Sequence, residues 1–541
     1  MHLIRFIALM LACALLVIAP AGCMMVGPDF ERPPSKVNEQ YSKSEVTEFT
    51  ASLGESKDRY LDPVLWWKGF NDPTLDKLLN QATSGNLNLQ QAALRVFQMQ
   101  AQLGVADASI LPVANLSAST IDYKNSVYQQ ITNNSSRLRL NSVLVQVNWE
   151  IDFWGKFRRG IESNLSGYMA AIAAYHSSDV ALSADVANAY INIRNFQALI
   201  DVAKTNLALQ AESLRIASAR FKYGETSMLD LSQATSMYEQ TKSEIPALIA
   251  SLKKAEFSIS ILLGEPPDYY EKMYGNTQGS LSPPPELGIG IPRDLLRRRP
   301  DVLQAEFSAA AQSSLIGVNK AALYPSFTLG GLFGFSNSNY GTLSSGGLFS
   351  WSNSSNGVSG GLMFPLFYRG AIIDQIRVQD AVFQQSVLAY QSQVLLAQKE
   401  VEESLITIST SKSAMGDLRK AVVAAQSAAA LALERYKSGQ NDYNTVISAQ
   451  QALLRVQNAN VQMQTNELLG YVGAFKALGG GWSADMQAPK LPDTMVNEMN
   501  DRTDWGSVLT NSGEPTNVKV GKFLSGPLLP RSADSGEKTN E

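Results

Sequence analysis

The sequence predicts an α+β protein made of two copies of one large strand-and-helix unit. The stretch Arg220–Gly224 (Arg-Phe-Lys-Tyr-Gly) returns as Arg435–Gly439 (Arg-Tyr-Lys-Ser-Gly), 215 positions later. Long stretches without glycine or proline predict rod-like helices, and segments with a period of two predict strands. A copy of this length far exceeds the repeats of ordinary solenoids. We therefore expect two pseudo-symmetric halves that arose by internal duplication.

The longest helical pattern lies in the second half. Residues 371–415 contain neither glycine nor proline. Apolar residues recur alternately every three and four positions over Ile373–Ile408, interrupted only at Asp380 and Ser404. This heptad spacing predicts coiled-coil packing. In the first half, the stretch Lys156–Tyr223 predicts a rod on the order of 100 Å long, at about 1.5 Å per residue. A rod of that length does not fit inside a compact domain.

Each long helix is predicted to reach a tight turn and to be followed by a helix that runs back. Gly224 and Gly439 supply the C-caps of the long helices, and Ser227 and Asp442 can cap the helices that return. The predicted helical hairpins cover residues 155–263 and 370–478, and shorter helices precede the strand regions at 76–110 and 293–323.

Two predicted β-hairpins, at 114–153 and 326–368, lie between the helices of each half. Over 143–153, odd-numbered residues are apolar or aromatic and even-numbered residues are polar except Leu144. A soluble sandwich with one buried face is one source of this pattern. In an exported protein, membrane-length strands with long polar loops favour a transmembrane barrel. Because about eight strands are the minimum for closure and open edges are not tolerated in lipid, several chains must share one barrel.

The N-terminus predicts export. Residues 1–22 have the basic residue, short apolar run and small residues of a signal peptide. The cleavage region resembles the bacterial lipobox, which implies that Cys23 becomes the lipid-bearing first residue; Cys13 is an earlier and less suitable candidate. The alternative is a cysteine that only lies in a cleaved leader. The mature chain would then hold one cysteine and one histidine, His176. This excludes a structural disulfide within the chain, a Cys/His zinc cluster and a Cys-His nucleophile. We expect no catalytic residues, no metal site and no cofactor apart from the covalent lipid.

The charge pattern excludes nucleic acid as a partner. The formal net charge is −4, and the chain has no long block of lysine and arginine. The short Arg297-Arg298-Arg299 triplet is followed by Pro300, so we interpret it as a helix start at a domain surface.

Several local motifs resemble the outer membrane factors, the TolC-like channels of efflux and type I secretion systems, and in particular their lipoprotein branch of the NodT/OprM type. The resemblance covers residues 23–482. The motifs that carry it are Val26–Pro33 after the lipid cysteine, Trp66–Asp76, Arg298–Val302, Pro365–Phe367 and both hairpin turns.

The resemblance implies a homotrimer in the bacterial outer membrane, lipid-anchored and extending into the periplasm. Four strands per chain would form a twelve-stranded transmembrane β-barrel, continuous with a long periplasmic α-helical barrel of coiled-coil hairpins. The hairpin tips would meet a periplasmic adaptor protein coupled to an inner-membrane pump of the resistance-nodulation-division type. Drugs or other small molecules would then pass out through a passive duct.

The resemblance also assigns roles at the tips. Arg220, Gly224, Arg435 and Gly439 fall on the tip motif and are candidates for contact with the adaptor. Asp230 matches a common acidic position inside the first hairpin, where it could form a ring of three charges or only cap its helix. Relatives with an apolar and an acidic constriction ring carry Leu and Asp in the second hairpin. Here those positions are Asn444 and Ser448, so we expect polar contacts and helix packing to hold the aperture.

The predicted organisation leaves two other classes of protein to consider. A periplasmic coiled-coil structural or adaptor lipoprotein would normally have one hairpin beside a small β-domain, and a cell-envelope hydrolase would need a nucleophile with a positioned base. The polar tail from Ser483 is expected to be disordered or to lie on the surface. The predicted parts are a signal peptide at 1–22, a lipidated and equatorial segment at 23–75, a first repeat at 76–264, a linker at 265–292, a second repeat at 293–479 and a tail at 480–541.

Overall fold

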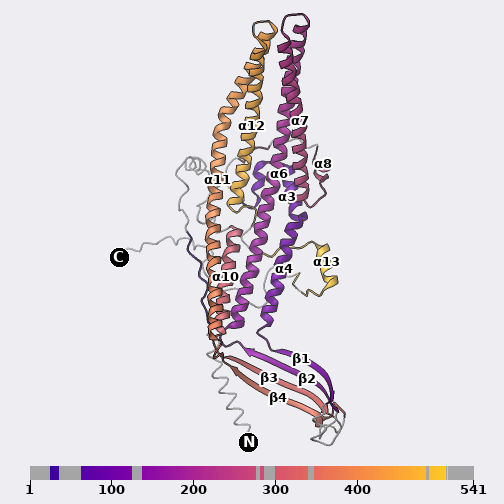
Figure 1. Cartoon of the computed structure of the whole chain (residues 1–541), viewed down its shortest axis with the longest axis vertical. Helices are drawn as coiled ribbons and strands as arrows, with labels where there is room; N and C mark the ends of the chain where they lie inside the picture. The colour runs from indigo at the N-terminus through magenta and orange to yellow at the C-terminus, as the bar shows by residue number, and fades with distance from the viewer. Residues whose placement is uncertain are drawn as a thin grey trace, which may run out of the picture.

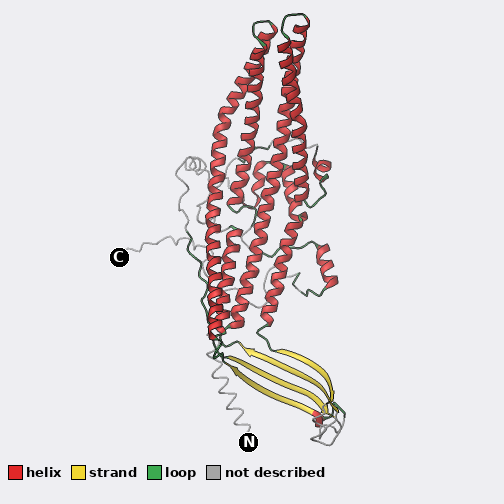
Figure 2. Ribbon diagram, viewed as in Figure 1, coloured by secondary structure: helices red, strands yellow, loops and turns green. Residues whose placement is uncertain are grey.

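The computed structural model describes residues 25–35, 63–124, 137–275, 281–284, 299–338, 347–482, 486–506 and 508–509. Its helices form an elongated body with two hairpin tips at one end and a four-stranded sheet at the other (Figures 1 and 2). Cys23, the predicted signal peptide and the end of the tail lie outside the described residues. None of the described helices is both long enough and apolar enough to cross a membrane.

The first half contains the long hairpin that the sequence predicts. Helix α6 (Lys156–Lys222) begins after Gly155, whose φ of 77° suits a glycine, and helix α7 (Met228–Leu262) runs back beside it. The predicted helix over 76–110 is wrong in one respect, because it is two helices. Helix α3 (Pro73–Gly85) ends at Asn86, whose side chain then accepts a hydrogen bond from Leu89 N and caps helix α4 (Leu87–Ala108).

The second half repeats this arrangement. Helix α11 (Arg369–Lys437) and helix α12 (Tyr443–Ala477) form the second long hairpin, and helix α10 (Pro300–Ala321) precedes the strands. The predicted seam on α11 is buried from Val387 to Ile408, whereas Ile373 at the sheet end is exposed. The short helices η2 (Pro63–Phe70), α8 (Tyr269–Tyr274) and η4 (Trp351–Asn353) lie outside the hairpins.

The predicted tail contributes an element that its polar composition did not indicate. Helix α13 (Asp493–Arg502) lies beside α4 in Figure 1. Met499 and Leu509 form a small apolar cluster with Phe97 of α4. This part of the tail therefore packs on the helical body.

The four strands form one antiparallel sheet in chain order. Strands β1 (Val113–Lys124), β2 (Arg137–Ile151), β3 (Ser326–Ser338) and β4 (Ser354–Met363) pair only with their neighbours in that order. The pairing of β2 with β3 joins the two halves, and β1 and β4 are left as edges. Strand β4 ends at Met363, so the predicted strand region to 368 is a few residues too long.

The register places apolar residues together on one face of the sheet. Val143 lies opposite Phe335, and Val145 lies opposite Phe333. On the other face, serines, glycines and threonines predominate, and the Ser119 and Ser142 hydroxyls lie 2.8 Å apart. Gly334 is needed there, because a Cβ at this position would lie 2.1 Å from the carbonyl oxygen of Val143. The expected alternation is thus present in the folded sheet.

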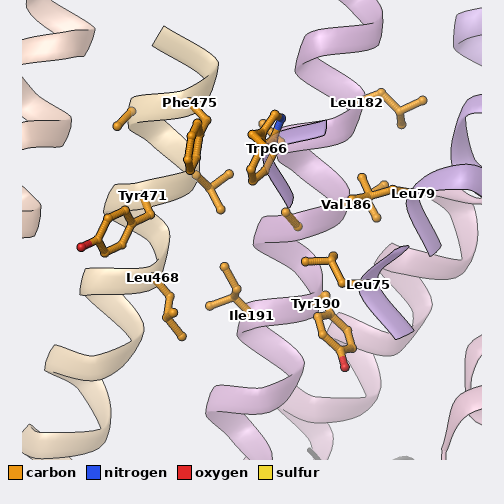
Figure 3. Packing of buried hydrophobic residues seen from close by; sticks show 14 of the residues in the cluster. Trp66, Leu75, Leu79, Leu182, Val186, Tyr190, Ile191, Leu468, Tyr471 and Phe475 are labelled. Atoms are coloured by element: carbon orange, nitrogen blue, oxygen red, sulfur yellow. The ribbon is translucent and has the colours of Figure 1, made fainter. Parts of the chain in front are cut away.

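The main apolar core lies midway along the helical body, where both halves meet. The Trp66 ring stacks on the Phe475 ring of α12 at 5.1 Å, and Tyr190 and Ile191 of α6 belong to the same buried cluster (Figure 3). Full burial of side chains of this size stabilises a fold by about 1.5–3 kcal/mol each. This cluster fixes the two hairpins against each other at their bases.

The prediction that the arginine triplet lies at a domain surface is wrong for Arg299, the one arginine of the three that the structure describes. Arg299 is buried, and its guanidinium lies 2.7 Å from the Asp301 carboxylate and 2.6 Å from the Glu400 carboxylate of α11. It also donates to the Ala477 carbonyl at 3.0 Å. Arg299 therefore connects the start of α10, the middle of α11 and the end of α12.

The N-terminal segment 25–35 lies along the helical body. Gly27, with φ of 101°, packs so closely on Gly317 of α10 that a Cβ would lie 2.4 Å from the Gly317 Cα. The Arg159 guanidinium donates to the Val26 carbonyl at 3.2 Å, and Arg32 forms an ion pair with Glu306 at 2.7 Å. Val26 N also donates to the carbonyl of Trp154 at 3.1 Å, so this segment starts at the junction of sheet and helices.

Candidate functional site

The two hairpin tips have the same backbone geometry. Gly224 and Gly439 both have φ of 73°, and each ends its helix by donating to a carbonyl three residues back, Phe221 and Tyr436 respectively. The return helices are capped as expected, since the side chains of Ser227 and Asp442 accept hydrogen bonds from backbone N–H groups of the following helix. The predicted tip glycines therefore lie at the exposed ends of the molecule (Figure 1).

Arg220 joins the two hairpins. Its guanidinium lies 4.7 Å from the centre of the Tyr436 ring and donates to the Tyr436 carbonyl, and it is 3.5 Å from the Glu225 carboxylate. Arginine over an aromatic face is attracted by about 0.5–2 kcal/mol, and more strongly when both are partly buried. Arg435, its equivalent in the second half, is exposed. The two arginines predicted to share one role therefore lie in different surroundings.

Asp230 links its own hairpin to the other one. Its carboxylate accepts a hydrogen bond from the Thr226 hydroxyl and a longer one of 3.4 Å from the Tyr436 hydroxyl. It also lies in the first turn of α7, where a negative charge is favourable. Burial and then the Asp230 charge raise the pKa of Tyr436, so its phenol stays protonated and can donate. Asp230 thus both stabilises its helix start and bridges the hairpins.

Two tyrosines complete this inter-hairpin contact. The Tyr436 and Tyr443 rings pack edge to face at 5.1 Å, and both side chains are fully buried beside Ile216 and Val446. Burial raises the pKa of Tyr443 as well. Sequence reasoning missed both tyrosines as functional residues, although Tyr436 stands inside the repeated tip motif.

Asn444 and Ser448 lie apart from this cluster. They are exposed one turn apart on α12, on the face opposite buried Tyr443, Val446 and Gln450. Neither side chain takes part in the hydrogen bonds around Asp230. The structure therefore places Asp230 between the hairpins and leaves the other two aperture candidates on an open face, and their roles at the aperture stay predictions.

A row of hydrogen bonds joins α6 to α12 between the tips and the apolar core. Asn195 accepts from the Thr465 hydroxyl at 2.9 Å, and the Asn206 amide donates to Gln457 at 2.6 Å. Nearer the tips, the Gln450 amide donates to the Ser213 hydroxyl at 2.7 Å. We call these three pairs the polar seam. All are neutral, so they fix the register of the two helices without charge.

The described residues contain no metal-binding group, and the one histidine among them has packing contacts. No group of three His, Cys, Asp or Glu side chains among them could hold a metal ion. The His176 ring bonds to the Gln487 carbonyl at 3.1 Å and packs 5.2 Å from the Trp482 ring. Burial lowers the pKa of His176, as expected for a packed neutral imidazole. His176 is therefore a packed residue of helix α6.

A family model decides what kind of protein this is. The model described as outer membrane efflux protein matches residues 78–265 and 291–480, which include the hairpins and the sheet. The chain belongs to the outer membrane efflux protein family. The matched blocks contain both tips, the polar seam and the Arg220–Tyr436 contact.

Curated relatives and solved structures agree with this assignment. This efflux protein is 28% identical over 471 residues to nodulation protein T of Rhizobium leguminosarum bv. trifolii, with 86% of this chain and 95% of the relative covered. It is 29% identical over 431 residues to the pyoverdine export outer membrane protein OpmQ of Pseudomonas aeruginosa, covering 78% and 88%. The outer-membrane channel OprN superposes with a TM-score of 0.77 at 28% identity, covering 84% of this chain and 99% of OprN.

A second solved structure supports the fold alone. The CmeC outer membrane channel of Campylobacter jejuni superposes with a TM-score of 0.76 at 23% identity, over 88% of this chain and 98% of CmeC. Together with the family match, these comparisons confirm the predicted function as the outer-membrane channel component of a tripartite efflux system, located in the bacterial outer membrane.

Proposed function

We propose that three copies of this chain form one channel, with a twelve-stranded barrel in the outer membrane and a helical barrel below it. The observation that carries this proposal is the single sheet of four strands with two open edges, β1 and β4. Unpaired strand edges cost several kcal/mol per exposed backbone group in hydrocarbon. Pairing β1 of one copy with β4 of the next removes every edge, and three copies supply the twelve strands of the proposed barrel.

The helical body supports the same assembly. Figure 1 shows α11 and α7 on opposite flanks, with α6 and α12 between them. Large apolar side chains are exposed along both flanks, among them Phe257 and Ile261 on α7 and Leu395 and Ile406 on α11. A neighbouring copy that brings its α7 against α11 would cover both sets. Exposed apolar stripes on long helices otherwise favour aggregation.

The mouth of the proposed duct lies at the hairpin tips. Asp230, Tyr436 and Arg220 hold the two hairpins of each chain together, and we assign them to the narrow state of the mouth. Asn444 and Ser448 would line the aperture as neutral groups. The exposed turns at Gly224 and Gly439, with Arg435, would face the periplasmic adaptor. The cargo then leaves through a polar duct and needs no catalytic group.

The lipid anchor would hold the chain at the membrane surface. Cys23 would carry the acyl chains, and the segment that follows it starts at the junction of sheet and helices through Val26 and Arg159. Two or more acyl chains give stable membrane anchoring, whereas one chain gives only reversible binding. The lipid would therefore hold the chain at the membrane together with the barrel.

The proposed partners are a periplasmic adaptor and an inner-membrane pump of the resistance-nodulation-division type. Relatives include a toluene efflux pump outer membrane protein of Pseudomonas putida and a pyoverdine export protein. Their names give toluene and pyoverdine, two different small molecules, which supports a duct that handles drugs or other small molecules without specific contact.

A susceptibility panel tests this function. Cells that lack the protein should become sensitive to a set of toxic small molecules, and loss of the partner pump should give the same set. Re-expression of the protein should restore resistance, whereas re-expression without residues 326–368, which removes half of the sheet, should not. Discordant panels for channel and pump, or rescue by the deleted variant, would contradict the proposal.

A further inference from the structure

The two halves of the tip are equivalent in sequence but differ in burial. Within the chain, the Arg220 guanidinium stacks on the Tyr436 ring at 4.7 Å. The residues at the equivalent positions, 215 further on for Arg220 and 215 back for Tyr436, are Arg435 and Phe221. Both of these side chains are exposed. The chain therefore contains the parts of a second contact that it does not make with itself.

The same relation holds for the three largest buried side chains around that contact. Ile216, Tyr436 and Tyr443 are 7%, 1% and 1% exposed. Their equivalents, in the same order, are Leu431, Phe221 and Met228, which are 62%, 39% and 60% exposed. These three exposed apolar groups indicate one missing partner surface and not scattered surface residues. Ala217 and Ala432, which are equivalent to each other, are both buried within the chain.

A ring of three chains supplies that surface, so this inference rests on the proposed trimer. In such a ring each second hairpin has its own first hairpin on one side and the first hairpin of the next chain on the other. We propose that Arg435 and Leu431 of one chain dock on Phe221 and Met228 of a second copy, with the guanidinium over the Phe221 ring. We call each contact between neighbouring hairpins a joint. The six hairpins of the ring would then be held by six joints, which alternate between joints within a chain and joints between chains.

At the hairpin tips, the joint between chains lacks the hydrogen bond and the ion pair that accompany the joint within a chain. Tyr436 donates to Asp230 within the chain. At the equivalent positions, Phe221 has no hydroxyl and Thr445 has no charge. The Glu225 carboxylate beside Arg220 likewise corresponds to neutral Gln440.

The polar seam is also confined to the joint within a chain. The hydrogen-bonded pair Asn206 and Gln457 corresponds to Ala421 and Lys242. The other pairs of the seam correspond to Ala428 with Thr235 and to Thr410 with Ala250. In each of these pairs only one side chain can form a hydrogen bond. Each neutral buried hydrogen bond adds to the stability of the contact that it crosses. The joints between chains are therefore the weaker kind.

Matched cysteine pairs test the contact directly. Arg435→Cys with Phe221→Cys is the pair between chains, and Arg220→Cys with Tyr436→Cys is the equivalent pair within a chain. The background suits thiol chemistry, because Cys13 falls in the predicted signal peptide and Cys23 is the predicted acylation site. Purified protein in mild detergent would be treated with a short bis-methanethiosulfonate reagent and run on a denaturing gel.

The first pair should give covalent dimer and trimer bands, and the control pair should give only monomer. If the first pair also stays monomeric while a native gel shows intact trimers, the docking contact is wrong and the trimer stands. If both variants and the unmodified protein are monomeric on the native gel, the proposed function itself fails. Cross-linking in cells to a different protein, with no homotypic bands, would show that the adaptor occupies this surface and would also overturn the inference.

Discussion

Removing one hydroxyl at the mouth should shift the channel toward its open state. Tyr436→Phe deletes the donor to Asp230 but keeps the ring on which Arg220 stacks and against which Tyr443 packs. The bond is 3.4 Å long, so we assign it about 0.5–1 kcal/mol, below the range of about 1.5–3 kcal/mol for well-formed bonds to charged groups.

The effect multiplies if the mouth opens as a unit. Three chains would together lose about 1.5–3 kcal/mol, and since each 1.4 kcal/mol is a factor of ten, the closed-to-open ratio should fall about 10- to 150-fold. Arg220→Ala should have a larger effect, because it removes both the ring contact and the bond to the Tyr436 carbonyl. Asp230→Ala should raise the open probability and reduce cation preference.

Open probability in planar bilayers measures this shift, and entry of an antibiotic too large for ordinary outer-membrane pores measures it in cells. Tyr223→Phe is the matched control, because Tyr223 lies at the same tip but is exposed. An unchanged open probability in Tyr436→Phe, or the same increase in Tyr223→Phe, would refute the reasoning.

Three further predictions concern stability. Arg299→Met should lower the unfolding free energy by about 2–3 kcal/mol, because it leaves partly buried acids unpaired. Burial alone would raise the pKa of Asp301, but bonds from Arg299 lower it. The stability lost in Arg299→Met should therefore shrink as the pH falls below about 4, where Asp301 becomes protonated. A difference in melting temperature between wild type and variant that stays unchanged below that pH argues against this cause. Burial lowers the pKa of His176, so the wild-type protein should lose stability below about pH 6.5. His176→Gln should lose less stability over the same pH range when both proteins are melted side by side. Equal losses exclude this cause. Gly334→Ala should abolish heat-stable trimers on gels, since a Cβ there meets the Val143 carbonyl; normal trimers would show that the sheet adapts.

The large elements could be predicted because their signals are periodic and repeated. The duplication fixed two hairpins of nearly equal length, and the alternation over 143–153 predicted the apolar face that the register confirms. The boundaries at Gly155, Gly224 and Gly439 were predictable because a positive φ favours glycine.

The errors came from interactions that join distant parts of the chain. The sequence around Arg299 is typical of a surface residue. In the structure, Asp301 and Glu400 neutralise the charge of its guanidinium in the interior. Asn86 interrupts a helical pattern because its side chain caps a new helix and its amide donates to the Leu262 carbonyl at 2.8 Å. Neither contact could be predicted from the periodicity of the local sequence.

The site was predicted in position but not in detail. The repeated motif located the tips, yet it gave Arg220 and Arg435 one role although only Arg220 packs within the chain. The bridging role of Asp230 depends on Tyr436, which is 206 residues away in the sequence. Only the folded arrangement of both hairpins brings these two side chains together.

Native mass spectrometry of protein extracted from outer membranes tests the central claim most directly. The account predicts one dominant species with three times the mass of a chain that starts at an acylated Cys23. A dominant monomer, under conditions in which an established outer-membrane trimer stays intact, would contradict the account of a barrel shared among three chains.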